Sequence, residues 1–286
     1  MSNPQSTGCC VLALPNQGEF PMSLHEDYIF PLQAHLAQPD WPALEQALLA
    51  QGFIIPPRGE DVPGPALQDL LHLLCRALDC GFQWKENIRT TGDVLRCYVE
   101  SADLPADFPT PDDLTMAETL ALLARHGIVI KDPYENKAVT WSSPMYSLGP
   151  ATLALLSANC MSDYERERYR FSLSLEACDG PNPMVHVGEN LEIPRVPGSE
   201  ELLKEMSPFG SHVDFLGAAW EDPAVQWHDE RSGRSYRILE LDWQYSMALG
   251  FRMVRLKGFD QDSTLRLAAV VAKLAGEPMG ASHLWL

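Results

Sequence analysis

The chain has 286 residues, of which 45% are hydrophobic and 21% are charged, so wholesale disorder is excluded and one large or two ordinary domains fit its length. Its 39 acidic residues against 21 basic ones give a formal net charge of −18. A surface this negative repels phosphate groups, which argues against nucleic-acid binding and against docking to anionic membranes.

The start of the chain carries few structural signals. Residues 1–38 are punctuated by Pro and Gln, which indicates an irregular lead-in with room for one edge strand. The first basic residue is Arg58, so the positive region that opens a secretory signal is missing. The longest apolar runs fall far short of the roughly 18 residues of a membrane span. We therefore expect the protein to stay in the cytoplasm.

The range 39–145 reads as a helix-rich lobe. Asp40-Trp41-Pro42 has the capping residue and early proline of a helix start, and Gly52 ends that helix before a short apolar strand. Leucines at helical spacing predict a second helix over 65–81. A third helix is expected with Thr110 as its cap, Pro111 at its first position and Gly127 as its stop.

One segment between these helices favours strands. Residues 82–89 and 94–100 alternate in polarity around Thr91-Gly92-Asp93, which predicts a hairpin.

The range 150–286 has longer alternating segments, which are typical of antiparallel strands with one buried face. These segments are 170–177, 236–245 and 251–257. Ser199 is expected to cap a short acidic helix, and Asp262 or Ser263 to cap a last helix ending at Ala275. The sequence thus predicts an α+β protein, with a helix-rich N-terminal half and a C-terminal half built on an antiparallel sheet with one or two packing helices. The two halves form separate lobes or one continuous domain.

The search for catalytic and cofactor motifs is negative. The chain has no Gly-x-Gly-x-x-Gly, Walker A, Gly-x-Ser-x-Gly or His-Glu-x-x-His segment, so no cofactor is expected. Its seven cysteines lack Cys-x-x-Cys spacing and are expected to be reduced thiols. An enzyme with a dispersed site stays open as an alternative, through Cys160 or Cys178 paired with His186 or His212.

A metal-dependent hydrolytic site is a second alternative. On a strand, the spacing of His212 and Asp214 would aim both side chains to one face, and His228 follows nearby. Such spacings are frequent by chance, so a surface role for these residues is the main expectation and no metal is assigned. His25-Glu26-Asp27 is a similar but weaker instance.

The acidic residues concentrate in two stretches. From Glu100 to Glu118 there are six acids and no Lys or Arg, and from Glu200 to Glu230 there are eight acids against Lys204. Two tryptophans lie beside acids in the second stretch, which is the composition of an interface with an aromatic anchor and a charged rim. The predicted partner-binding residues are Asp103, Asp107, Asp112, Asp113, Trp220, Glu221, Asp222, Trp227, Asp229 and Glu230.

In charge, size and expected compartment the chain resembles bacterial immunity proteins, which inhibit toxins. The resemblance extends to no motif and transfers no specific site. Fifteen arginines against six lysines are typical of a high-GC bacterium. The sequence therefore favours a non-catalytic inhibitor that binds one basic toxin or nuclease stoichiometrically. An adaptor of a secretion-system assembly is the third alternative, and it differs in having several partners.

Overall fold

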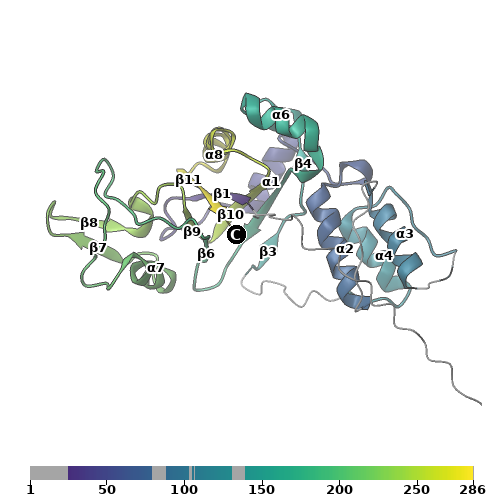
Figure 1. Cartoon of the computed structure of the whole chain (residues 1–286), viewed down its shortest axis with the longest axis horizontal. Helices are drawn as coiled ribbons and strands as arrows, with labels where there is room; N and C mark the ends of the chain where they lie inside the picture. Colours follow the sequence, from purple (N-terminus) through teal and green to yellow (C-terminus); the bar gives the residue numbers. More distant parts are fainter. Residues whose placement is uncertain (1–24, 79–87, 103–104, 106, 131–138, 286) are drawn as a thin grey trace, which may run out of the picture.

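The computed structural model describes residues 25–78, 88–102, 105, 107–130 and 139–285. Within these ranges the chain forms eight α-helices and eleven strands (Figure 1). The helices are α1 (Trp41–Ala50), α2 (Gly64–Leu78), α3 (Thr91–Ser101), α4 (Met116–Arg125), α5 (Pro150–Leu153), α6 (Ala158–Glu167), α7 (His212–Glu221) and α8 (Gln261–Ala275). The strands are β1 (His25–Pro31), β2 (Ile54–Ile55), β3 (Trp141–Ser142), β4 (Ser147–Leu148), β5 (Ser172–Ala177), β6 (Met184–Val187), β7 (Gln226–Asp229), β8 (Arg234–Arg237), β9 (Met247–Gly250), β10 (Arg252–Lys257) and β11 (Met279–Trp285). The expected α+β class is confirmed.

A five-stranded antiparallel sheet organises the fold, in the order β11-β1-β10-β5-β3. The strand that falls within the expected lead-in, β1, is an interior strand and not an edge. Its Tyr28 lies opposite Arg255 of β10 on one side and Ser282 of β11 on the other. The sheet therefore joins a segment near the start of the chain to the last strand.

One face of this sheet is apolar. Because side chains alternate along a strand, Ile29, Val254 and Leu175 share this face, and all three are fully buried. They pack with residues of α1 and α8, which cover the face (Figure 1). Helix α1 begins as expected, with Asp40 capping it and Pro42 in its first turn.

The opposite face is divided. Towards one end Tyr28, Phe30 and Met253 pack against the two-stranded sheet β6–β9. Towards the other end the same face carries Glu26 and Arg255, whose side chains form an ion pair. This end of the face is therefore polar, although Glu26 itself is 1% exposed.

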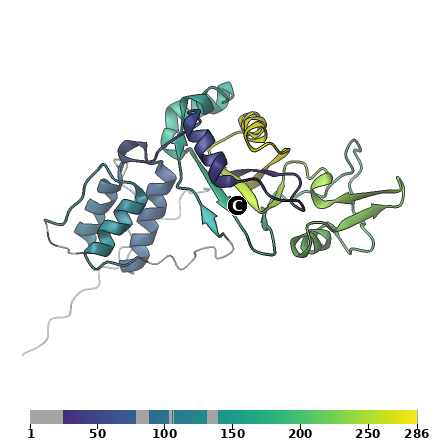
Figure 2. The ribbon, with the colours of Figure 1, turned by 180° about the vertical axis from the view of Figure 1, so that it is seen from behind.

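Figures 1 and 2 show an elongated molecule with smaller units at either end of the sheet. At one end α2, α3 and α4 enclose their own core, which includes Leu70, Leu95 and Leu123. At the other end α7 and the β7–β8 hairpin enclose a core with Phe215 and Trp227.

In the part of the chain that the structure describes, the longest helices are α2 and α8, with 15 residues each. No helix there has both the length and the apolar character needed to cross a bilayer.

The prediction of a hairpin around Thr91-Gly92-Asp93 is wrong for the described residues. Residues 91–101 form α3, which begins with a capping box between Thr90 and Asp93. Val94, Leu95 and Tyr98 are buried on one side of this helix. The buried positions therefore recur with the spacing of a helix and not with that of a strand. Residues 82–87 lie outside the described residues.

The start of α4 was also expected too early, at Pro111. The helix begins at Met116, where Thr115 and Glu118 form a second capping box, and its end just before Gly127 agrees with expectation. A capping box marks a helix start more strongly than a threonine followed by a proline, because the two side chains of the box satisfy two backbone N–H groups.

Three expectations in the C-terminal half are corrected. The strand expected over 236–245 breaks after Arg237 into the 3₁₀ turn Ile238–Glu240. Residues 199–202 form no helix, because Leu202 instead pairs with Arg195 in an isolated bridge. Helix α8 is capped by Asp260, two residues before Asp262.

Candidate functional site

Helix α7 presents the candidate surface, and its local sequence explains how. Ser211 caps the helix by accepting a hydrogen bond from the backbone N–H of Asp214. Phe215 and Ala219, four residues apart, are fully buried and fasten the inner side of the helix to the core. The helix ends at Glu221 ahead of Pro223, which cannot continue it easily.

The outer side of α7 carries two exposed hydrophobic side chains. Val213 is 53% exposed and Trp220 is 47% exposed. Gly217 lies between them, is exposed, and has no atom within 4 Å of where its side chain would project. Positions 213, 217 and 220 fall on one helix face, so Val213 and Trp220 face solvent on the same side with the backbone of Gly217 between them, and we call this side the apolar stripe.

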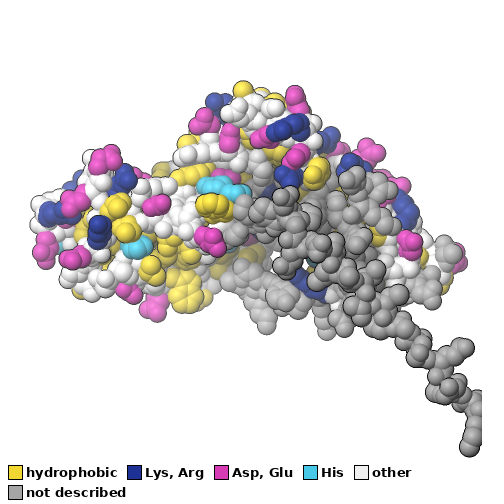
Figure 3. Space-filling model, in the orientation of Figure 1, with side chains coloured by type: hydrophobic (Ala, Val, Ile, Leu, Met, Phe, Trp, Pro, Cys, Tyr) yellow, Lys and Arg dark blue, Asp and Glu magenta, His cyan; other side chains and the backbone are white. Residues whose placement is uncertain are grey.

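Acidic residues border the stripe. Asp214, Glu221 and Asp222 are exposed at the two ends of the helix. One oxygen of Asp222 accepts the backbone N–H of Ala224 at 2.9 Å, which holds the carboxylate in place. Figure 3 shows hydrophobic side chains at the position of α7 with acidic ones at their border. We call Val213, Asp214, Gly217, Trp220, Glu221 and Asp222 the α7 surface.

A recess opens beside the C-terminal end of this surface. Asp222 and Pro223 line it together with His35, Asp179 and Arg252, and its volume is about 470 Å³. The carboxylate of Asp179 accepts hydrogen bonds from Arg252 and Thr140, so its charge is already compensated. The α7 surface therefore continues, through Asp222, into a concave region.

Two residues predicted for the interface are not on the surface. Trp227 is 5% exposed and belongs to the core under α7. Asp229 is 6% exposed, and its carboxylate accepts the backbone N–H groups of Arg231 and Ser232 in the β7–β8 turn. Alternation along β7 turns both side chains inwards, whereas Glu230 beyond it is exposed.

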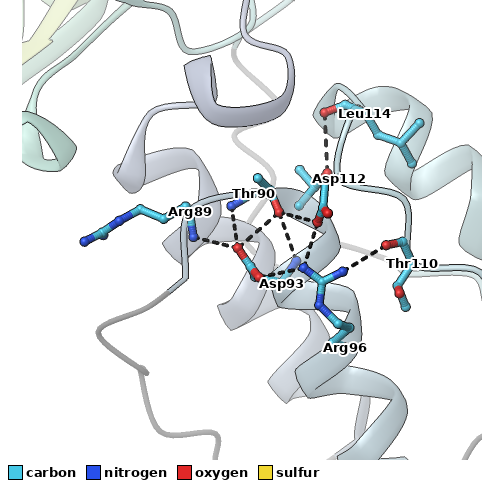
Figure 4. Close-up of polar contacts among 8 residues, drawn as sticks. Arg89, Thr90, Asp93, Arg96, Thr110, Asp112 and Leu114 are labelled. Atoms are coloured by element: carbon cyan, nitrogen blue, oxygen red, sulfur yellow. Dashed lines mark hydrogen bonds and ion pairs between the residues drawn. The ribbon is translucent and has the colours of Figure 1, made fainter.

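The first acidic stretch has a different role at Asp112. Its Oδ1 accepts hydrogen bonds from Thr90 Oγ1 at 2.9 Å and from Arg96 Nη2 at 2.7 Å (Figure 4). Arg96 also bonds Asp93 and the carbonyl of Thr110. This network fastens the segment before α4 to the start of α3, and it lowers the pKa of Asp112 through the hydrogen bond of Arg96. Asp112 is therefore exposed, but its carboxylate is engaged in hydrogen bonds within the protein.

The remaining acids of that stretch are dispersed. Asp113 has an 80% exposed side chain, with Arg58 at 3.6 Å, and Asp107 is exposed. Asp103 lies outside the described residues. The α3–α4 unit and α7 lie at opposite ends of the molecule (Figures 1 and 2). The two acidic stretches therefore do not form one surface.

The residues of the metal alternative are not brought together. His212 and Asp214 lie in the first turn of α7 and not on a strand, so their spacing does not aim them to one side. His228 lies on β7 with its Nδ1 3.2 Å from Ser235 Oγ. Among the described residues, no group of three or more His, Cys, Asp or Glu side chains has an arrangement that would hold a metal ion.

The two thiols of the nucleophile alternative are buried among carbonyl groups. Cys160 Sγ lies 3.7 Å from the carbonyl oxygen of Gly258, and Cys178 Sγ lies 3.4 Å from that of Asn182. Burial raises the pKa of the Cys160 thiol, which is the reverse of what activates a nucleophile.

Sequence reasoning missed two polar clusters on the central sheet. In the first, the buried carboxylate of Asp27 accepts from Tyr245 at 3.0 Å and contacts His283 Nδ1 at 3.2 Å. His283 Nε2 in turn lies 3.0 Å from His25 Nδ1. The short segment His25-Glu26-Asp27 is a local signal for this cluster, but its partner His283 is 256 positions away from Asp27.

The second cluster lies on the polar part of the opposite face and includes Glu26, Tyr28 and Arg255. Arg255 donates to Glu26 through both Nε and Nη2. Glu26 is 1% exposed, so this is a buried ion pair with bidentate geometry.

Comparisons with protein-family models, with curated proteins and with solved structures found no match to this chain.

Proposed function

We propose that this chain is a non-catalytic binding protein that inhibits one basic protein, of the toxin or nuclease class, in the manner of a bacterial immunity protein. The observation that carries the proposal is the α7 surface, an exposed apolar stripe with Trp220 at one end and acidic residues on its border. The proposed compartment is the cytoplasm, where a net charge of −18 would favour a basic partner.

Each part of the α7 surface has a distinct role in this proposal. Trp220 supplies a large, rigid side chain whose burial on binding removes apolar area from water. Glu221 and Asp222 attract the partner and speed its association, because their charges act over about a Debye length. The fixed backbone of the helix limits the entropy lost on binding.

The inhibitor is tested first by purification from the native host at low salt and again at high salt. We expect one basic protein in a near 1:1 ratio at low salt and less of it at high salt, because screening weakens the attraction. Several partners would favour the adaptor alternative, and the absence of any partner would direct attention to the enzyme alternative.

The charge of the α7 surface is tested with the identified partner. In the double variant Glu221→Gln/Asp222→Asn, association at low salt should slow by about threefold to tenfold, while dissociation changes less. The matched control is Glu165→Gln/Asp262→Asn, which removes two exposed acids from α6 and α8. Equal association rates for the two double variants would contradict the electrostatic part of the proposal.

The apolar part is tested by Trp220→Ala. We expect affinity to fall by about 2 kcal/mol or more, roughly thirtyfold, mainly through faster dissociation. Leu265→Ala on α8 is the control, because Leu265 is also 47% exposed. Unchanged affinity in Trp220→Ala would rule out α7 as the binding surface.

A further inference from the structure

The polar part of the central sheet carries a set of side chains that the proposed function does not use. We call Glu26, Ser172, Ser174, Glu176, Arg255 and Lys257 the polar strip. Arg255 lies directly opposite Ser174, and Lys257 directly opposite Ser172, on the neighbouring strands β10 and β5. Opposite residues of an antiparallel pair share a face, so the two cations and the two hydroxyls form one compact array.

The carboxylate of Glu26 accepts several hydrogen bonds within this array. It accepts hydrogen bonds from Tyr28 OH at 2.7 Å, from Arg255 Nε at 2.9 Å and from Arg255 Nη2. Burial opposes the charge of Glu26, but the hydrogen bonds and charge of Arg255 keep its pKa below the usual value. Glu26 and Arg255 therefore compensate each other.

Among the described residues, Lys257 has only a longer ion pair, with the same Glu26. Its nearest carboxylate oxygen, Glu26 Oε1, lies 3.7 Å from Nζ, which is beyond hydrogen-bond distance. The Lys257 side chain is only 18% exposed, whereas Lys204 and Lys273, the other lysines in the described ranges, are both exposed. A lysine side chain that is mostly removed from water is stabilised by an acceptor close to its ammonium group.

The other donors of the strip are also incompletely used. The third guanidinium nitrogen of Arg255, Nη1, lies 3.7 Å from Glu176. Ser172 and Ser174 are 3% and 7% exposed. Ser282, which lies beside the strip opposite Tyr28, has a buried hydroxyl without a hydrogen-bond partner among the described residues.

We propose that the polar strip binds a small oxyanion, a carboxylate or a phosphate, held by Lys257 Nζ, Arg255 Nη1 and the hydroxyls of Ser172 and Ser174. Such a ligand supplies the acceptors that these donors lack, in charge-assisted hydrogen bonds. A cation suits this array less well, because it would be repelled by Arg255 and Lys257, which both lie beside Glu26.

Two other acids, Glu176 within the strip and Asp69 beside it, are compatible with this ligand. Glu176 lies on β5, and Asp69 on α2 is within the electrostatic influence of Lys257 and Arg255. Burial raises the pKa of Glu176, which reduces its tendency to carry a negative charge near the ligand. Asp69 is exposed, so water screens its charge.

The site is tested by isothermal titration calorimetry of the full chain with inorganic phosphate and, separately, with succinate, at an ionic strength held constant with chloride. Wild type should bind at least one of them saturably. Lys257→Met should weaken that binding by about tenfold or more, because it removes the charged donor. Lys273→Met removes the same charge from an exposed position and should bind like wild type.

The titrations distinguish the two kinds of anion and can refute the site. Binding of phosphate alone identifies a phosphate-bearing ligand, and binding of succinate alone identifies a carboxylate. The absence of saturable binding of either anion by wild type, or equal affinity in Lys257→Met, overturns the proposal. If Lys257→Met does not fold, Ser174→Ala replaces it, with several-fold weaker binding supporting the site and unchanged binding refuting it. None of these measurements involves α7, so the result is independent of the proposed inhibitor function.

Discussion

His186 and His283 lie near the central sheet, and their surroundings move their pKa values in opposite directions. His186 stacks on Tyr28 with ring centroids 4.3 Å apart, and burial lowers its pKa to about 4. The hydrogen bond to Asp27 raises the pKa of His283. The first histidine is therefore kept neutral by desolvation, and the second is stabilised in its charged form by a carboxylate.

The lowered pKa of His186 predicts that the stability of the protein falls on acidification. In the unfolded chain this histidine takes up a proton near pH 6.5, but in the folded protein only near pH 4, so acidification through this range favours unfolding by up to about 3 kcal/mol. His186→Phe keeps a ring on Tyr28 and removes the titration. Urea unfolding between about pH 7 and about pH 4.5 should show a smaller loss of stability in the variant than in wild type.

His283→Gln serves as a control of opposite sign. The stabilisation of His283 is present below about pH 6.5 and disappears as the pH rises through its raised folded-state pKa. If wild type and His186→Phe lose stability in parallel on acidification, burial of a neutral histidine is not what destabilises the protein in acid.

At the level of elements, the first turn of α3 depends on a glycine for a close approach. A Cβ atom at Gly92 would lie 2.4 Å from Asp112 Oδ1 and 2.8 Å from the carbonyl oxygen of Pro111. The second atom belongs to the backbone and cannot turn away. The Asp112 network in Figure 4 therefore requires the absence of a side chain at position 92.

Two glycine-to-alanine substitutions in helices should accordingly have opposite effects. Gly92→Ala should lower the free energy of unfolding by about 1–3 kcal/mol, because the clash exceeds the gain in helix propensity. Gly217→Ala, with no atom within 4 Å of the new side chain, should raise it by about 0.5–1 kcal/mol. Denaturant unfolding of both variants measures these changes. A stabilised Gly92→Ala variant would show that the segment 110–112 moves freely away from α3.

For the whole molecule, the net charge of −18 affects stability. Like charges on a folded surface repel each other, and salt screens this repulsion. We expect the thermal unfolding midpoint to rise as sodium chloride increases from about 10 mM to about 300 mM. The same series with Glu221→Gln/Asp222→Asn should show a smaller rise, since less charge is left to screen. A falling midpoint would mean that attractive pairs such as Glu26–Arg255 outweigh the repulsion.

Several elements could be predicted from local sequence because their determinants are local. The start of α1 follows from Asp40 and Pro42, and the end of α4 from Gly127, since capping and left-handed turns involve only a few neighbouring residues. The alternating pattern likewise indicates β5 and β10. For α3 two local signals disagree: the alternation in polarity predicts a strand, and the capping box predicts a helix. The burial of Leu95 and Tyr98 agrees with the helix.

The candidate site was predictable only in part. Trp220 and Trp227 both stand beside acids in the sequence, but the helical phase of α7 turns Trp220 outwards and the alternation of β7 turns Trp227 into the core. Composition cannot distinguish the two, because exposure depends on which side of each element meets the core.

By itself, the sequence determined the charge of the protein, its α+β class and many of its helix ends, because these follow from composition and from contacts between near neighbours. Only the tertiary structure decided that β1 is an interior strand, that Asp27 meets His283, and that Lys257 lies opposite Ser172 beside the Glu26–Arg255 pair. These relations join residues far apart in the chain, and the pairing order of the strands, which no local pattern encodes, brings them together.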